Sequence, residues 1–218
     1  MPDFQELPNP QGTTQHRGSV NSSRPYLEAV GGSAEAELYC RLQTGDEEAL
    51  AIIYRKHQAP VYRFALRMTG SEATAEDVVQ EVFLGLIRSP GGFDPQRGTL
   101  GSYLFGMARN QVFRSLGAWK HLSLDDERDG EGNENEPAAY NLDVLTEMTR
   151  REQIELLRQA VLSLPPHYRE VVVLCDLDEL SYADAAEILG CAIGTVRSRL
   201  HRARSLLLER LNRSRCVA

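Results

Sequence analysis

The stretch SYADAAEILGCAIGTVRSRLHRARSLLLERL, at residues 181–211, decides the fold of the C-terminal part of this 218-residue chain. Ser181 and Asp184 form a capping-box pattern, and the apolar residues that follow predict a short helix. Gly190 stands where a left-handed helix cap favours glycine. A short turn and a longer second helix from Ile193 complete the pattern. Residues 181–204 therefore predict a helix-turn-helix, a motif whose second helix lies in the major groove of DNA.

The second helix of this motif separates apolar from basic side chains. Apolar residues recur at alternating spacings of three and four and so form one stripe: Ile193, Val196, Leu200, Ala203 and Leu207. Arginines on the opposite arc can donate hydrogen bonds to phosphates and guanine edges. The alternative is that this arc is an ordinary basic helix face exposed to solvent. We favour DNA contact, because the arc lies on the second helix of the motif. The candidate residues are Thr195, Arg197, Ser198, Arg199, His201 and Arg202.

Charge is unevenly distributed along the chain. The formal net charge is −7, yet the segment from Cys191 to the C-terminus carries +6 and the first 190 residues carry −13. The basic segment suits nucleic acid, whereas the acidic remainder needs a different partner. No apolar run approaches the about 20 residues of a spanning helix, and the N-terminus lacks a signal-peptide pattern. We therefore expect no membrane insertion and a cytoplasmic location.

The distribution of reactive side chains indicates no cofactor. The four cysteines form no C-x-x-C pair and have no histidine at zinc-finger spacing: Cys40, Cys175, Cys191 and Cys216. The chain also lacks a phosphate-binding glycine loop and a nucleophile elbow. We therefore expect no metal, no cofactor and no enzymatic activity.

Composition divides the chain into two folded domains and two polar segments. Residues 1–35 are rich in Pro, Gly, Ser and Asn, which predicts a disordered N-terminal extension. Residues 121–147 predict a flexible acidic linker, because nine acids and one base occupy positions 123–147. The remaining domains, residues 36–120 and 148–213, show helical periodicity without strand alternation. The expected fold class is all-α.

Local signals place the helices of both domains. Thr44 is the expected cap of the first long helix, with Glu47 completing a capping box. Pro60 is expected to bend or split that helix. Ser71 or Thr74 caps the next helix, which runs to residue 87. The other predicted helices cover residues 99–116, 147–163 and 167–177.

The stretch DVVQEVFLGLI at residues 77–87 combines an apolar stripe with a polar face. The predicted buried residues are Val78, Val79, Val82, Phe83, Leu86 and Ile87. Asp77, Gln80 and Glu81 share one exposed face, because they are spaced at i, i+3 and i+4. The alternatives for this face are a binding surface and an ordinary acidic helix surface.

At this point the motifs resemble those of a known family. GTVRSRLHRAR (194–204), after SYADAAEILGC, closely resembles region four of bacterial sigma factors of the extracytoplasmic-function (ECF) group. ALRMTGSEATAEDVVQEVFLGLIR (65–88) and GTLGSYLFGMARNQVFRSL (98–116) resemble region two. The resemblance implies a protein that binds core RNA polymerase and promoter DNA and starts transcription. It also implies an anti-sigma factor as a partner. The alternative function is a stand-alone helix-turn-helix transcriptional regulator.

The resemblance also implies roles for individual residues. It assigns core-polymerase binding to Asp77, Gln80 and Glu81, and the minus-thirty-five element to the helix-turn-helix. It assigns opening of the minus-ten element to the helix at residues 99–116 and the loop before it. The minus-ten candidates are Phe93, Ser102, Tyr103, Arg109, Asn110 and Arg114. Phe93 fits base stacking and a core position equally well, whereas a core position is favoured for Tyr103.

Overall fold

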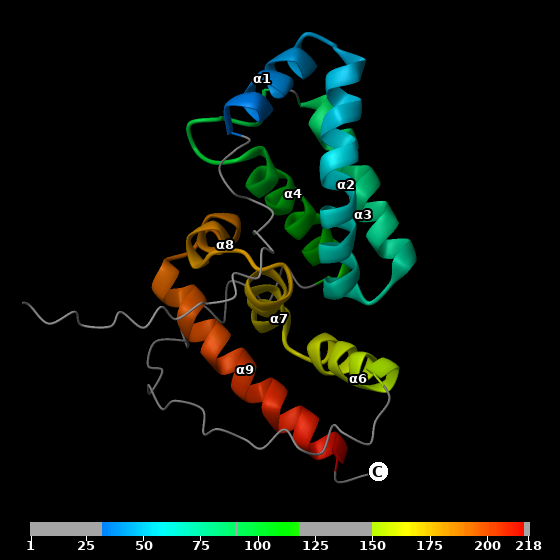
Figure 1. Ribbon diagram of the computed structural model, residues 1–218, viewed down its shortest axis with the longest axis vertical. Helices are drawn as coiled ribbons and strands as arrows, with labels where there is room; N and C mark the ends of the chain where they lie inside the picture. Colours follow the sequence, from blue (N-terminus) through cyan, green and yellow to red (C-terminus); the bar gives the residue numbers. More distant parts are fainter. Residues whose placement is uncertain (1–31, 90, 118–149, 216–218) are drawn as a thin grey trace, which may run out of the picture.

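The computed structural model describes residues 32–89, 91–117 and 150–215, and these ranges contain helices and no strand (Figure 1). The N-terminal domain consists of α1 (Gly32–Gln43), α2 (Glu47–Thr69), α3 (Glu72–Arg88) and α4 (Leu100–Ser115). The C-terminal domain consists of α6 (Arg150–Leu162), α7 (Pro166–Val172), the π-helical turn η2 (Val173–Leu177), α8 (Tyr182–Leu189) and α9 (Ile193–Arg215). The all-α prediction is confirmed, and the predicted acidic linker lies outside the described residues.

Helix α1 begins inside the segment predicted to be disordered, most of which lies outside the described residues. Glu35 is buried, and Tyr39 is almost fully buried against the N-terminal domain. The polar composition of residues 1–35 concealed this helix, because its order depends on packing against α2. The prediction of disorder is therefore wrong for residues 32–35.

The long helix α2 differs from its prediction at two points. Its cap is Asp46, whose Oδ1 accepts hydrogen bonds from the backbone N–H of Glu48 (2.9 Å) and Ala49 (3.1 Å). Thr44, the predicted cap, instead donates its hydroxyl to the carbonyl of Arg41. The helix also continues through Pro60, because the buried proline packs with the domain core and tertiary contacts with α3 and α4 outweigh one lost hydrogen bond.

The N-terminal domain has a closely packed apolar core between α2, α3 and α4. Phe64 and Phe105 meet edge to face, with ring centroids 5.5 Å apart. Each fully buried side chain of this size stabilises the fold by roughly 1.5–3 kcal/mol relative to exposure. The predicted cap of α3 is confirmed at Ser71, whose Oγ accepts from the N–H of Thr74.

The predicted helix-turn-helix is confirmed in the C-terminal domain. Ser181 Oγ accepts a hydrogen bond from the N–H of Asp184 at 3.1 Å and donates to its carboxylate at 2.6 Å. Gly190 ends α8 with φ 65°, the left-handed conformation that the sequence predicts. Before the motif, the N–H of Asp178 bonds to the carbonyl of Val173 at 2.9 Å, which closes the π-helical turn.

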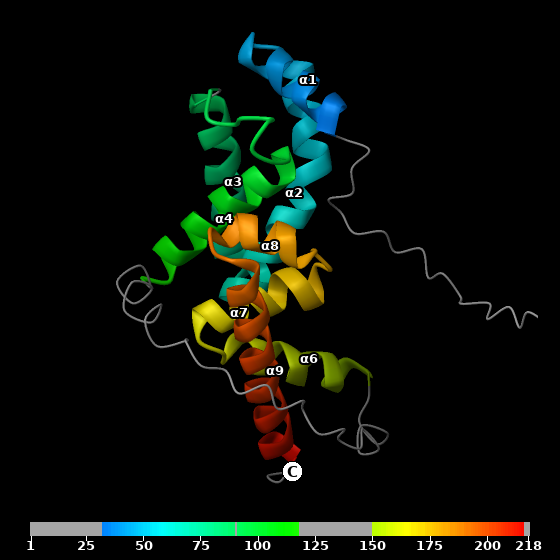
Figure 2. The same cartoon turned by 90° about the vertical axis from the view of Figure 1, so that its left-hand side faces the viewer.

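The two domains are in contact. Helix α8 lies beside α4 in both views (Figures 1 and 2), and α2 contacts α6, α7 and η2. This arrangement brings the predicted minus-ten helix against the helix-turn-helix domain. Within the described ranges, no helix has the length and hydropathy needed to cross a bilayer.

Candidate functional site

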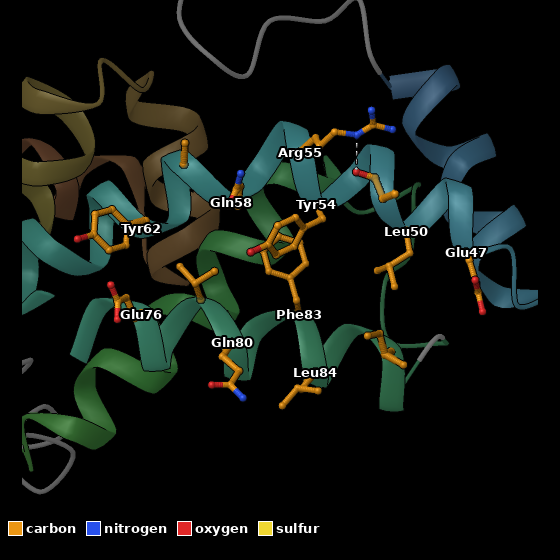
Figure 3. A pocket seen from close by; sticks show the side chains of 14 residues that line it. Glu47, Leu50, Tyr54, Arg55, Gln58, Tyr62, Glu76, Gln80, Phe83 and Leu84 are labelled. Carbon is orange, nitrogen blue, oxygen red and sulfur yellow. Dashed lines mark hydrogen bonds between the residues drawn. The ribbon is translucent and has the colours of Figure 1, made fainter. Parts of the chain in front are cut away.

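The polar face of α3 borders a groove between α2 and α3 (Figure 3). Asp77, Gln80 and Glu81 are all exposed, as their spacing predicts. The groove has a volume of about 810 Å³, and Gln80 lies at its edge. Its walls are mainly apolar or aromatic: Leu50, Tyr54, Tyr62, Val79, Phe83, Leu84 and Ile87. Polar side chains beside an apolar groove suit a helical protein partner.

The groove corrects one prediction for α3. Ile87 was expected in the buried stripe, but 47% of its surface is exposed because it lines the open groove. At the groove, the ring centroids of Tyr54 on α2 and Phe83 on α3 lie 4.7 Å apart (Figure 3). The sequence analysis gave Tyr54 no role in a site. Its site role was missed because no local pattern indicates that two helices leave a gap between them.

Helix α4 holds the predicted minus-ten residues in different environments. Asn110 and Arg114 are exposed. Ser102 is buried, and its backbone N–H donates to the Thr99 hydroxyl at 3.0 Å in the helix cap. Access to DNA is therefore absent for Ser102 in this conformation, because it belongs to the first turn that Thr99 caps.

The two aromatic candidates lie at the edge of the N-terminal core. Phe93 is 8% exposed, and its N–H donates to the hydroxyl of Tyr39 at 3.0 Å. The rings of Tyr39 and Phe93 meet edge to face at 4.9 Å. Tyr103 is half-buried 5.7 Å from Phe93, and burial raises the pKa of its hydroxyl. The structure therefore places Phe93 in the core, one of its two open alternatives, and Tyr103 beside it.

Arg109 is occupied by the other domain. Its Nε donates to Glu170 Oε2 at 2.7 Å, and its Nη2 donates to Oε1 at 3.2 Å. Glu170, on α7, is completely buried. The guanidinium also lies 4.9 Å from the centroid of the Phe113 ring. A predicted DNA-contacting residue is therefore held by a buried carboxylate in this conformation.

Helix α9 presents fewer arginines than its arc predicts. Arg197 and Arg202 are exposed, but Arg199 is only 6% exposed. Ile193, expected in the apolar stripe, is 43% exposed. These two differences have one cause: the buried face is rotated toward Arg199 and away from Ile193, while Val196 stays at its centre. Thr195, Ser198 and His201 are partly exposed beside these two arginines. The guanidinium of Arg197 lies 5.8 Å from the centroid of the Tyr182 ring.

Arg204 joins the recognition helix to the π-helical turn. Its Nη2 lies 2.6 Å from Asp176 Oδ1, and its Nε lies 3.1 Å from Oδ2. This hydrogen bond raises the pKa of Arg204. The contact positions α9 against η2 and directs Arg204 away from the exposed arc.

Comparison with known proteins identifies both domains. A model described as Sigma-70 region 2 matches residues 53–128, and one described as Sigma-70, region 4 matches residues 154–207. The chain is 34% identical over 181 residues to the ECF RNA polymerase sigma factor SigE of Mycolicibacterium smegmatis, covering 77% of this chain and 65% of that protein. It is 33% identical over 175 residues to the ECF RNA polymerase sigma factor SigW of Bacillus subtilis, covering 78% of this chain and 93% of that protein.

Solved structures show the same architecture. CnrH, in a complex with the cytosolic domain of CnrY, matches with a TM-score of 0.60 and 22% identity over 82% of this chain and 97% of that chain. The sigma factor RpoE of Bartonella quintana, in a complex with the anti-sigma factor NepR, matches with a TM-score of 0.50 and 30% identity, covering 71% of this chain and 91% of that chain. The first likeness supports the fold, and the second agrees with the sequence relatives.

Proposed function

This chain belongs to the extracytoplasmic-function (ECF) family of RNA polymerase sigma factors, and from this premise we propose how its two domains share transcription initiation. The protein binds core RNA polymerase and directs promoter recognition, which is DNA recognition and not enzymatic catalysis. We assign polymerase binding and the minus-ten element to the N-terminal domain. We assign recognition of the minus-thirty-five element to the helix-turn-helix of the C-terminal domain.

The groove between α2 and α3 carries the proposal for core binding. It offers apolar walls to a partner helix, while Asp77 and Glu81 offer carboxylates to cations on that partner. The family resemblance assigns this face to a basic coiled coil of the largest polymerase subunit. Charge complementarity of this kind raises the rate and specificity of association more than the affinity.

Helix α4 is proposed to bind the opened minus-ten element. Asn110 and Arg114 are exposed donors on its second half, and Arg109 lies one residue from Asn110. Stacking of an unpaired base on an aromatic ring would offset part of the cost of opening the duplex. Tyr103 is the better placed ring for this role, because it is less buried than Phe93.

Helix α9 is proposed to bind the minus-thirty-five element from its N-terminal half. Arg197 and Arg202 present exposed guanidinium groups, with Thr195, Ser198 and His201 between them. Arginine is the side chain best suited to bind two acceptors of one guanine. Arg199 is withdrawn from this proposal as a direct base contact, because its side chain is buried.

A second protein partner and a location follow from family membership. The RpoE relative was solved with an anti-sigma factor, and we propose that an anti-sigma factor also regulates this chain. We propose the cytoplasm as its location, because its proposed binding partners are core polymerase and promoter DNA.

Reconstituted transcription tests the proposed function. Purified chain is mixed with core RNA polymerase and genomic DNA fragments, and the 5′ ends of the transcripts are sequenced. We expect starts at a small set of promoters that share two conserved elements, and none with core polymerase alone. Failure of the chain to form a complex with core polymerase would overturn the proposal.

A further inference from the structure

Two ion pairs join the domains near the predicted minus-ten helix. The first is the two-pronged contact of Arg109 on α4 with Glu170 on α7. The second joins Arg67 on α2 to the carboxylate of Asp178, just after η2. Arg67 also donates to the carbonyl of Leu177 at 3.1 Å. Both pairs link residues that are more than 60 positions apart in the chain.

A third arginine reinforces the junction from the opposite direction. Arg169, next to Glu170 on α7, donates to the carbonyl of Met68 near the end of α2. It also donates to the carbonyls of Leu162 and Leu164 in its own domain. Charged and polar contacts therefore form one part of the junction, beside apolar packing that joins the two domains.

The energetics of buried ion pairs suit a contact that can be released. Removing two charges from water costs about as much as their attraction returns, so a buried pair is close to break-even overall. In the closed form, each charge of the Arg109–Glu170 pair is compensated by the other across the domain boundary. Removing only one partner is far more costly to the closed form, because the other charge stays buried and unpaired.

We propose that the Arg109–Glu170 pair is an intramolecular latch that holds the two domains together and keeps Arg109 from promoter DNA. This inference rests on the proposed function, because it assigns a regulatory state to the same minus-ten helix. The latch opens before α4 binds the non-template strand. The Arg67–Asp178 pair supports the closed state from the neighbouring helix.

The polymerase-binding groove is separate from this latch. The residues that line the groove belong to α2 and α3, and none of them takes part in either ion pair. Core polymerase can therefore dock on the groove while the latch is closed. The closed chain is competent for polymerase and not for the minus-ten element.

The two ion pairs do not contribute equally. Both carboxylate oxygens of Glu170 accept hydrogen bonds from Arg109. Asp178 uses only Oδ1 for Arg67, and its buried Oδ2 has no hydrogen-bond partner among the described residues. An unsatisfied buried oxygen destabilises the closed form. The Arg67–Asp178 pair is therefore expected to contribute less to the closed state than the Arg109–Glu170 pair.

The latch is tested by the variant Glu170→Gln, which removes the charge and keeps the shape. Its matched control is Glu155→Gln, which breaks an exposed ion pair with Arg158 on α6 of the same domain. Phenylglyoxal modifies accessible arginines, and mass spectrometry of peptides measures its reaction with Arg109. We expect Glu170→Gln to raise Arg109 reactivity severalfold and to increase the radius of gyration in small-angle X-ray scattering. Glu155→Gln should match the wild-type chain in both.

A second variant guards against misfolding. Arg67→Gln changes a half-exposed side chain and should also increase Arg109 reactivity, by a smaller factor. Circular dichroism establishes that each variant keeps its helices. If both variants fold and Arg109 reacts as slowly as in the wild-type chain, the latch is overturned.

The consequence for DNA is measured separately. The probe is a single-stranded oligonucleotide with the non-template minus-ten sequence mapped by reconstituted transcription. Without core polymerase, Glu170→Gln should bind this probe severalfold more tightly than the wild-type chain, and equal affinity would overturn the latch. Failure of the proposed function has a different signature, because the wild-type chain would then direct no promoter-specific transcription with core polymerase.

Discussion

Arginines at neighbouring positions of α9 meet different surroundings. Arg202 is exposed, Arg199 is buried, and Arg204 is held by Asp176. Residues three positions apart on a helix differ in direction by about 60°, and this offset separates the buried Arg199 from the exposed Arg202, so a basic run does not translate directly into DNA contacts. Among these three, Arg202 is the residue best placed to contact a base.

Substitution of Arg202 tests this placement. Arg202→Ala should weaken recognition of the minus-thirty-five element by about 1–3 kcal/mol, because a two-pronged contact with one base is lost. Binding of holoenzyme to promoters with altered minus-thirty-five bases measures the effect. Arg213→Ala is the control, because this exposed arginine lies near the end of α9. An equal loss for every minus-thirty-five sequence would show that Arg202 contacts phosphate only.

The surroundings of Glu35 lead us to expect a pH-dependent contribution of this residue to stability. Its Oε1 lies 3.1 Å from His57 Nε2 and 2.5 Å from Lys56 Nζ. Burial raises the pKa of Glu35, but hydrogen bonds with His57 and Lys56 outweigh burial and leave the pKa below its usual value of 4.5. A carboxyl group with a lowered folded-state pKa stabilises the fold above its unfolded pKa. That contribution is lost as the pH falls through the folded-state value.

Thermal melting of Glu35→Gln at several pH values measures this contribution. The variant should melt at a lower temperature than the wild-type chain near neutral pH. The difference should shrink as the pH falls below the ordinary glutamate pKa of 4.5, because wild-type Glu35 then becomes neutral as well. A difference that stays constant down to acidic pH would contradict the role of this charge.

The helices differ in how well their ends could be predicted from the sequence. The capping box of α8 and its terminal Gly190 were predictable, because both depend on residues within a few positions of each other. The cap of α2 was not, because Thr44 and Asp46 are both suitable caps and the end of α1 uses Thr44. Continuity of α2 through Pro60 depended on neighbouring helices rather than on local preference.

Two glycine substitutions with opposite outcomes test helix-end geometry. Gly190→Ala should destabilise the chain by about 1–2 kcal/mol, because alanine is strained at φ 65° although the space around it is open. Gly106→Ala also meets open space but lies inside α4, so it should stabilise by about 0.5–1 kcal/mol. Denaturant unfolding measures both. Similar effects of the two substitutions would contradict the assigned left-handed cap.

The exposed face of α3 makes a prediction at the scale of the helix. Asp77→Ala combined with Gln80→Ala should reduce affinity for core polymerase severalfold without lowering the melting temperature, because both side chains are exposed. Glu37→Ala on α1 is the control, since it removes an exposed charge from a different helix. A lowered melting temperature with intact affinity for core polymerase would reject the assignment.

At the scale of the whole molecule, the chain has an acidic N-terminal part and a basic C-terminal segment. The chain has a net charge of −7, although the segment from Cys191 onward is strongly basic. An acidic N-terminal part suits a basic polymerase surface, and the basic helix suits DNA. The closed arrangement also sets carboxylates of the C-terminal domain against arginines of α2 and α4.

Salt dependence follows from this division. Binding of holoenzyme to promoter DNA should weaken steeply as salt rises, with a log–log slope of about −0.9 for each phosphate neutralised. Fluorescence anisotropy with labelled promoter DNA measures the slope. Arg197→Ala, which removes one exposed cation from α9, should make the slope shallower. An affinity that does not change with salt would contradict phosphate contact by the basic helix.

The sequence by itself determined the all-α fold class, the helix-turn-helix and the exposed polar face of α3. These features depend on caps and periodicity, which act between residues a few positions apart. Only the tertiary structure decided the rotation of α9 that buries Arg199, the groove between α2 and α3, and the capture of Arg109 by Glu170. Such contacts join distant parts of the chain and depend on packing, so they leave no local pattern in the sequence.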